Sequence, residues 1–100
     1  MNLIPLKRVT VIIEDAVERK LTKALIELGA KGYTVDTVRG GGEAGLRDNA
    51  WEGENVRIVT VVAPEVAYRI VEYLQQHFLG QYHGIVYLSD VEVLRGERFV

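Results

Sequence analysis

The segment KRVTVIIEDAVERKLTKALIELGAKGYTVDTV, from Lys7 to Val38, changes its hydrophobic period twice, which predicts a strand, a helix and a second strand in succession. Its first part, Lys7 to Ile13, is rich in β-branched residues and indicates a strand that is buried on both faces or centrally placed. Apolar residues then recur at helical spacing from Ala16 to Leu28, with charged residues between them, and Asp15 is the predicted N-cap.

The end of this helix and the next two strands also have clear signals. Gly29 lies just beyond the last apolar turn, where a left-handed cap is easiest for glycine. Tyr33 to Val38 alternates in polarity and predicts the second strand, while the apolar run Val56 to Val62 predicts the third.

The remaining chain predicts a second helix and a last strand. Pro64 is well placed at a helix start, helical spacing continues over Glu65 to Phe78, and Gly80 ends the helix. Gly84 to Leu94 is the last predicted strand. The order βαββαβ predicts an α+β fold of the ferredoxin-like kind, with two helices on one face of a four-stranded antiparallel sheet.

Such a sheet has a second face that no helix covers. The predicted strands carry apolar residues on both sides, as where Val11 and Ile13 oppose Ile12 in the first strand. A monomer would expose these residues to water, and burying them against other copies of the chain avoids that exposure. We therefore expect a homo-oligomer.

Length and composition narrow the function further. One hundred residues with 12 basic and 14 acidic side chains predict a single domain, spanning 1–100, without the basic surface of a dedicated nucleic-acid binder. No apolar run approaches the roughly 20 residues needed to cross a bilayer. The absence of cysteine excludes disulfides and thiolate catalysis and fits a cytoplasmic protein.

The interruption RGGGEAGLRDNAWEGEN, from Arg39 to Asn55, is the predicted working part of the chain. Loops of this length are uncommon in compact domains and are often functional. Its glycines allow the backbone to approach a ligand closely, and Arg39 and Arg47 provide donors suited to phosphate or carboxylate. Trp51 is either an anchor for a ligand or partner or a residue packed on its own sheet edge, and the loop itself could be a plain hairpin tip.

No catalytic or metal motif is present. His77 and His83 are the only histidines, and their spacing matches no usual zinc site. The acidic pair Glu14 and Asp15 lies at a helix start, where carboxylates are ordinary. Ser89 is the sole serine and has no partner triad.

The chain resembles the PII-like signalling proteins, especially the carbon-handling branch that includes the SbtB regulators and the carboxysome-associated PII proteins. The resemblance is based on LTKALIELGAKGYTVDTVRG at Leu21 to Gly40, on the glycine and arginine loop, on the ending YHGIVYLSDVEVLRGERF, and on the βαββαβ order. It covers the chain from Lys7 to Val100.

The resemblance implies a homotrimer whose sheets line a central core, with an adenine nucleotide in each cleft between neighbouring subunits. The segment from 39 to 55 corresponds to the flexible T-loop, which meets a target protein in this family. The resemblance implies nucleotide contacts from Gly32, Tyr33 and Thr34 at the base of the cleft and from Arg39, Gly40, Gly41 and Gly42 at the root of the loop. Arg47 is the implied phosphate contact on the loop. Across the subunit boundary, Gly84, Ile85 and Val86 would lie along the adenine, and Arg95 and Arg98 of the tail would contact the phosphates. The implied target contacts on the loop are Glu43, Leu46 and Trp51.

Two departures refine this reading. Related SbtB loops carry two arginines where this chain has Ala44 and Arg47, and a less positive site should hold fewer phosphates, which favours ADP or AMP over ATP. The terminal cysteine pair of some SbtB proteins is also missing, which favours the carboxysome-associated type. For that type the resemblance implies bicarbonate as a second ligand and a bicarbonate transporter or carbon-fixation protein as the target.

The sequence leaves two other classes of function open. Ferredoxin-like trimers can hold catalytic groups in their subunit clefts, so a small enzyme is the main rival to a non-catalytic sensor. A metal-tolerance protein of the same shape is the third reading, weakened by the lack of cysteine and by the presence of only 2 histidines and 1 methionine.

Overall fold

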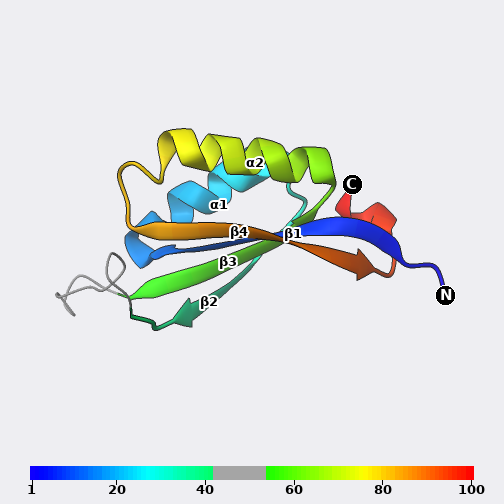
Figure 1. Cartoon of the computed structure of the whole chain (residues 1–100), viewed down its shortest axis with the longest axis horizontal. Coiled ribbons are helices and arrows are strands. Elements are labelled where there is room, and N and C mark those ends of the chain that lie inside the picture. Colours follow the sequence, from blue (N-terminus) through cyan, green and yellow to red (C-terminus); the bar gives the residue numbers. More distant parts are fainter. Residues whose placement is uncertain (42–53) are drawn as a thin grey trace.

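The computed structural model describes residues 1–41 and 54–100, which form a four-stranded sheet with two α-helices packed on it (Figure 1). In chain order the elements are β1 (Ile4–Glu14), the 3-10 turn η1 (Asp15–Val17), α1 (Glu18–Glu27), β2 (Thr34–Val38), β3 (Asn55–Val62), α2 (Pro64–His77), β4 (Gly84–Val93) and the 3-10 turn η3 (Gly96–Phe99). The predicted βαββαβ order is confirmed.

The strands lie in the order β2-β3-β1-β4, and each adjacent pair is antiparallel. β1 and β3 are therefore the inner strands, while β2 and β4 form the two edges. Figure 1 shows both helices on the same side of this sheet. The predicted ferredoxin-like α+β fold is confirmed.

The core lies between the helices and the sheet. Val9, Val11 and Ile13 point from β1 toward the helices, and each is at most 1% exposed. The apolar stripe of each helix packs against them, because i, i+3 and i+4 positions share one helix face. The other fully buried large side chains of this layer are Leu21, Leu25, Ile58, Val62, Ile70, Leu74 and Phe78. Burying each such side chain stabilises the fold by roughly 1.5–3 kcal/mol.

The opposite face of the sheet has no helix over it (Figure 1). Ile85 and Tyr87 project from β4 on this open face and are 56% and 45% exposed. The centre of the face also carries charge, since Arg8 on β1 and Arg57 on β3 alternate with the core-facing residues. The open face is therefore a mixture of apolar side chains and arginines.

The helix starts differ from the prediction in one respect. The prediction that Asp15 is the N-cap was wrong, because Asp15 is the first residue of η1 and α1 begins only at Glu18. Neither η1 nor α1 has a side-chain hydrogen bond that caps its N-terminus. The carboxylate of Asp15 instead accepts a hydrogen bond from the backbone N–H of Glu54, a contact that no local pattern encodes. Pro64 does occupy the first turn of α2, as predicted.

Strand boundaries shift by up to three residues. β1 begins at Ile4 and includes Pro5, because at this level β1 pairs only with β4 and a proline with one neighbouring strand costs little. β4 ends at Val93, one residue before the predicted end, since Arg95 turns into the left-handed region at φ 57°. Gly29 has the predicted positive φ, at 121°.

Candidate functional site

One end of the sheet gathers the two segments that the sequence analysis placed at a binding site. β2 ends opposite the start of β3, which in turn lies opposite the end of β1, where β4 begins. The loop root, Arg39 to Gly41, and the start of β4, Gly84 to Val86, therefore lie at the same end of the sheet. Both segments are at the edges of the sheet, one on each side.

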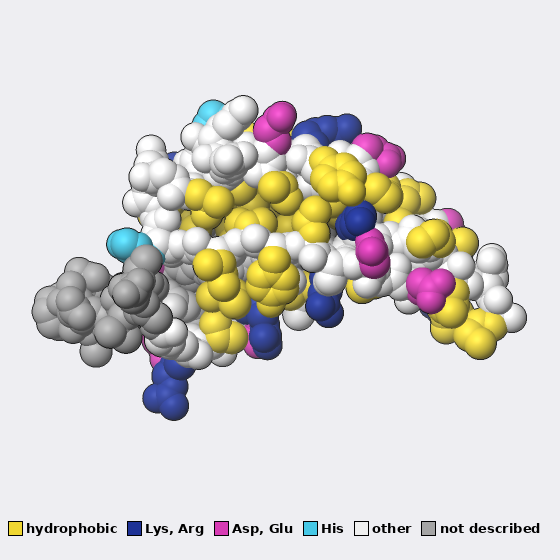
Figure 2. Space-filling model, in the orientation of Figure 1, with side chains coloured by type: hydrophobic (Ala, Val, Ile, Leu, Met, Phe, Trp, Pro, Cys, Tyr) yellow, Lys and Arg dark blue, Asp and Glu magenta, His cyan; other side chains and the backbone are white. Residues whose placement is uncertain are grey.

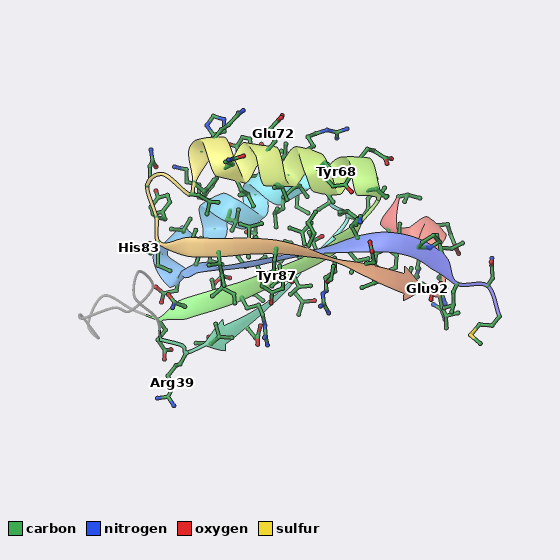
Figure 3. All side chains as sticks on the ribbon, viewed as in Figure 1. Arg39, Tyr68, Glu72, His83, Tyr87 and Glu92 are labelled. Atoms are coloured by element: carbon green, nitrogen blue, oxygen red, sulfur yellow. The ribbon has the colours of Figure 1, made fainter. Side chains whose placement is uncertain are left out.

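The loop root is open to solvent. Arg39 is exposed and extends away from the sheet at this end (Figure 3). It makes no side-chain hydrogen bond or ion pair with any other residue that the structure describes. A side chain added at Gly40 would meet no atom within 4 Å. Among the described residues, nothing therefore competes with an anion for the guanidinium of Arg39, and there is open space beside Gly40.

The return of the chain from the loop is fixed to the end of β1. The backbone N–H of Asp15 donates to the carbonyl oxygen of Glu54 at 2.8 Å, and the N–H of Glu54 donates to the Asp15 carboxylate at 3.3 Å. These two hydrogen bonds hold the start of β3 against η1. The loop therefore re-enters the sheet at a defined point.

At the start of β4, the backbone of Gly84 lies close to β1. A Cβ at Gly84 would lie 3.1 Å from the carbonyl oxygen of Ile12 and 3.1 Å from Cγ1 of Ile13, so glycine allows this close approach. The next two residues point to opposite sides. Ile85 is exposed on the open face, whereas Val86 packs against the core. Only Ile85 can offer its side chain to a ligand here.

The segment before β2 lies further along the same edge as the loop root. Gly32 has open space around its α-carbon, and its carbonyl oxygen accepts a hydrogen bond from the Thr60 hydroxyl at 2.6 Å. Tyr33 is 47% exposed, and Thr34 begins β2 opposite Val59. The backbone of this edge is therefore held to β3 at Gly32, while the ring of Tyr33 is half exposed to solvent.

The C-terminal arginines lie at the other end of the sheet. Arg95 is in the left-handed region, and its carbonyl oxygen accepts from the N–H of Arg98 at 3.0 Å. Gly96 packs on Ile4 so closely that an added Cβ would be 2.6 Å from it. A shallow hollow of about 520 Å³ lies beside this turn, lined by Asn2, Ile4, Leu94, Arg95, Gly96, Glu97 and Val100.

One chain therefore does not bring all the predicted site residues together. The edges that carry Arg39 and Gly84 are separated by two strands, which corresponds to about 14 Å at the usual spacing between strands. Ile85 and Arg95 are ten residues apart along and beyond β4, which is about 33 Å of extended chain. A site that uses all of these groups requires more than one copy of the chain.

Within residues 1–41 and 54–100, two ion pairs change the electrostatics of the sheet. Arg57 donates from Nε and Nη2 to the two carboxylate oxygens of Asp36, at 3.0 and 2.6 Å. The hydrogen bond with Asp36 raises the pKa of Arg57. Lys7 Nζ lies 2.6 Å from the Asp90 carboxylate, and this hydrogen bond raises the pKa of Lys7.

Asp36 and Arg57 have no local sequence signal that predicts their pairing. Knowledge of the register between β2 and β3 would have predicted this pair. Val38 pairs with Asn55, so Asp36, two residues before Val38, lies opposite Arg57, two residues after Asn55. Cross-strand pairs of opposite charge at such positions stabilise a sheet. The long loop between the strands hides this register from any pattern read along the chain.

Several predicted contacts lie outside the described residues. These are Gly42, Glu43, Leu46, Arg47 and Trp51. Within residues 1–41 and 54–100, no group of three or more His, Cys, Asp or Glu side chains could hold a metal ion. In the same residues, no helix is long and apolar enough to span a bilayer.

The fold and this distribution of residues match a known class of protein. The chain has a TM-score of 0.87 and 43% identity to a protein from Thermus thermophilus assigned to the PII-like signalling proteins, with 100% of both chains covered. The sequence profile of the nitrogen regulatory protein P-II family matches residues 6–98. The chain therefore belongs to the P-II family.

Structures of the protein CPII from Thiomonas intermedia are also similar. CPII bound to ADP and bicarbonate has a TM-score of 0.86 and 29% identity, covering 99% of this chain and 98% of CPII. CPII bound to ADP, AMP and acetate has a TM-score of 0.88 and 28% identity, with the same coverage. The resemblance to the PII-like signalling proteins is thus confirmed, while the carbon-handling branch, with its SbtB-like and carboxysome-associated types, stays a prediction.

Proposed function

We propose that this protein is a non-catalytic signalling protein that binds ADP or AMP in clefts between the subunits of a homotrimer. Bicarbonate is the second ligand, and the segment from 39 to 55 passes the bound state to a target protein.

One observation carries this proposal. CPII, a P-II-like protein that matches this chain over nearly its whole length, is bound to ADP and bicarbonate. A second CPII structure holds both ADP and AMP, the two nucleotides favoured by a loop that keeps Arg47 but has Ala44 where related loops carry another arginine. ATP is disfavoured here because a third phosphate would require more positive charge than this chain provides.

The placement of the candidate residues supports a site between subunits. Arg39 and Gly84 lie on opposite edges of one sheet, and Arg95 lies at its other end. Figure 2 shows apolar side chains above and below the β4 edge, which would become buried if another copy lay against it. Homotrimers are typical of the P-II family, and a trimer that packs the open faces together would also bury their exposed apolar side chains, Ile85 and Tyr87.

The site residues then have distinct roles. Gly32, Tyr33 and Thr34 form the base of the cleft. Across the subunit boundary, Gly84 and Ile85 lie along the adenine, with the backbone of Val86. Arg39 and the glycines that follow it reach the phosphates, joined by Arg47 from the loop. Arg95 and Arg98 extend the phosphate contacts from a neighbouring subunit.

The output is the T-loop, here the segment from 39 to 55. Ordering a glycine-rich segment costs roughly 1–2 kcal/mol of backbone entropy per residue, and ligand contacts offset this cost. Nucleotide occupancy therefore selects an ordered arm whose Glu43, Leu46 and Trp51 contact the target. The target is a bicarbonate transporter or a carbon-fixation protein, as in the carboxysome-associated branch.

The test is a calorimetric titration of the protein with AMP, ADP, ATP and cyclic AMP, each with and without bicarbonate. We expect saturable binding of ADP and AMP at one site per chain, strengthened by bicarbonate. Arg39→Ala should weaken ADP binding about tenfold or more, since a hydrogen bond to a charged group contributes about 1.5–3 kcal/mol. Arg19→Ala, on the exposed surface of α1, is the charge-matched control and should leave the affinity unchanged.

The same samples distinguish a sensor from an enzyme. After prolonged incubation, a sensor returns each nucleotide chemically unchanged, as measured by chromatography. Steady conversion of any nucleotide would show catalysis in the cleft, and absence of heat with all four would remove the nucleotide from the proposed function.

A further inference from the structure

The open face of the sheet carries two arginines in different electrostatic states. Arg57 is neutralised by Asp36 through two hydrogen bonds from its guanidinium group. Arg8 has no such carboxylate: its Nε donates to the Ser89 hydroxyl at 3.1 Å, and the structure gives it no ion pair within residues 1–41 and 54–100. The two terminal nitrogens of Arg8 thus make no hydrogen bond with any residue that the structure describes.

Arg8 also lies near the centre of this face. It is in the middle of β1, an inner strand, and pairs with Val61 of β3 on one side and Ser89 of β4 on the other. Tyr87 and Ile85 continue the same face along β4, half exposed to solvent. Figure 3 shows Tyr87 pointing away from the helices, and Figure 2 shows Lys and Arg side chains on that side of the sheet.

Covering this face has an electrostatic consequence. If three copies pack their open faces around one axis, as in the trimer of the proposed function, three Arg8 side chains turn toward that axis. Three like charges taken out of water repel one another and lose hydration, unless an anion lies between them. Asp36, on the edge strand β2, is the acidic side chain of this face that pairs with an arginine, and it is already held by Arg57.

We propose that the three Arg8 side chains of the trimer bind one small oxyanion on the axis, such as sulfate, phosphate or bicarbonate. The guanidinium group suits this ligand because its planar donors match two oxygens of an oxyanion at once. Ser89 is the positioning residue, since its hydroxyl accepts the hydrogen bond from Nε and so fixes one side of the guanidinium group. This site is separate from the nucleotide clefts, and it rests on the trimer of the proposed function.

The test uses nucleotide-free protein and three probes at matched ionic strength: sodium sulfate, sodium phosphate and sodium bicarbonate, with sodium chloride as the reference. Thermal unfolding and calorimetry are recorded for each. We expect at least one oxyanion to raise the Tm saturably above chloride, and to bind with one ion for every three chains. The stoichiometry separates this site from the nucleotide clefts, where one ligand per chain is expected.

Three variants make the result specific. Arg8→Gln should abolish the oxyanion-dependent rise in Tm, and Ser89→Ala should weaken the oxyanion several-fold while keeping the charge. Arg19→Gln makes the same change of charge on α1 and should behave as the wild type. ADP affinity in Arg8→Gln should be unchanged, so failure of the nucleotide site and failure of the axial site can be told apart.

Three results would overturn the inference. The first is an equal oxyanion effect in wild type and Arg8→Gln. The second is a stoichiometry of one ion per chain. The third is a wild type that responds to no oxyanion while Arg8→Gln dissociates the trimer, which would assign Arg8 to a carboxylate of a neighbouring copy.

Discussion

Replacing Gly96 by alanine should destabilise the protein strongly through a single steric contact. A Cβ at this position would lie 2.6 Å from both Cβ and Cγ1 of Ile4, and 2.8 Å from its Cγ2. These distances are far inside van der Waals contact, and the atoms belong to the branched root of Ile4, which cannot rotate away. The turn that carries Arg95 and Arg98 must therefore lift away from β1.

Overpacking of this kind costs about 1–3 kcal/mol. For a domain of this size each kcal/mol lowers the Tm by about 4–8 °C, so a cost of about 2 kcal/mol lowers it by about 8–16 °C. The assay is thermal unfolding followed by circular dichroism, at one fixed protein concentration because an oligomer gains stability by mass action.

Gly80→Ala is the matched control, since nothing lies within 4 Å of a Cβ at that position. Its Tm should stay close to that of the wild type. If Gly96→Ala and Gly80→Ala had the same Tm, the close packing of η3 on β1 would be refuted. A fall in both would indicate a general loss of helix or turn stability rather than a clash with Ile4.

Three further substitutions test other contacts. Lys7→Gln should lower the free energy of unfolding relative to wild type near neutral pH, where the Lys7 ammonium is charged and bonded to Asp90. Because this hydrogen bond raises the Lys7 pKa above its ordinary 10.5, the difference between the two proteins should disappear as the pH rises through the raised pKa. Urea unfolding of both proteins at pH 9 and above pH 11 measures this difference. Asp15→Ala should cost about 1 kcal/mol in chemical unfolding by releasing the N–H of Glu54, while Asp15→Asn keeps the acceptor; equal losses would show that the charge matters instead. Gly84→Ala should lower the Tm by less than Gly96→Ala does, because its nearest contacts are 3.1 Å, and a larger loss would mean that the start of β4 cannot move.

Much of the fold could be predicted from the sequence because its elements have strong local signals. The β-branched run of β1 and the helical spacing before Leu28 each determine an element type within a few residues. The order of these elements was then sufficient for the ferredoxin-like architecture, since few topologies accommodate it. Pro64 and Gly29 mark boundaries through backbone geometry alone, and both predictions are confirmed.

The contacts that no pattern revealed join residues far apart in the chain. Asp15 looked like an N-cap because aspartate before an apolar helical stretch usually is one, yet its carboxylate hydrogen-bonds to the chain as it returns at Glu54. The left-handed turn at Arg95 depends on Gly96 packing against Ile4, at the opposite end of the sequence. Such contacts arise from the register of the whole sheet.

The candidate site, like the fold, could be predicted only in part from the sequence. The loop root at Arg39 and the glycine at the start of β4 could be identified from composition and from the family resemblance. Their positions on opposite edges could be learned only from the strand order, which separates β2 from β4. That separation is the physical reason for expecting a second copy of the chain at each site, and the roles of the individual residues stay predictions.

Native mass spectrometry of the protein with ADP tests the central claim most directly, because it counts chains and nucleotides in the same particle. We expect a trimer that carries up to three ADP molecules, with no ADP on any monomer, and with higher occupancy when bicarbonate is present. A monomer that binds ADP, or a trimer that stays empty at saturating ADP, would contradict a nucleotide site built between subunits.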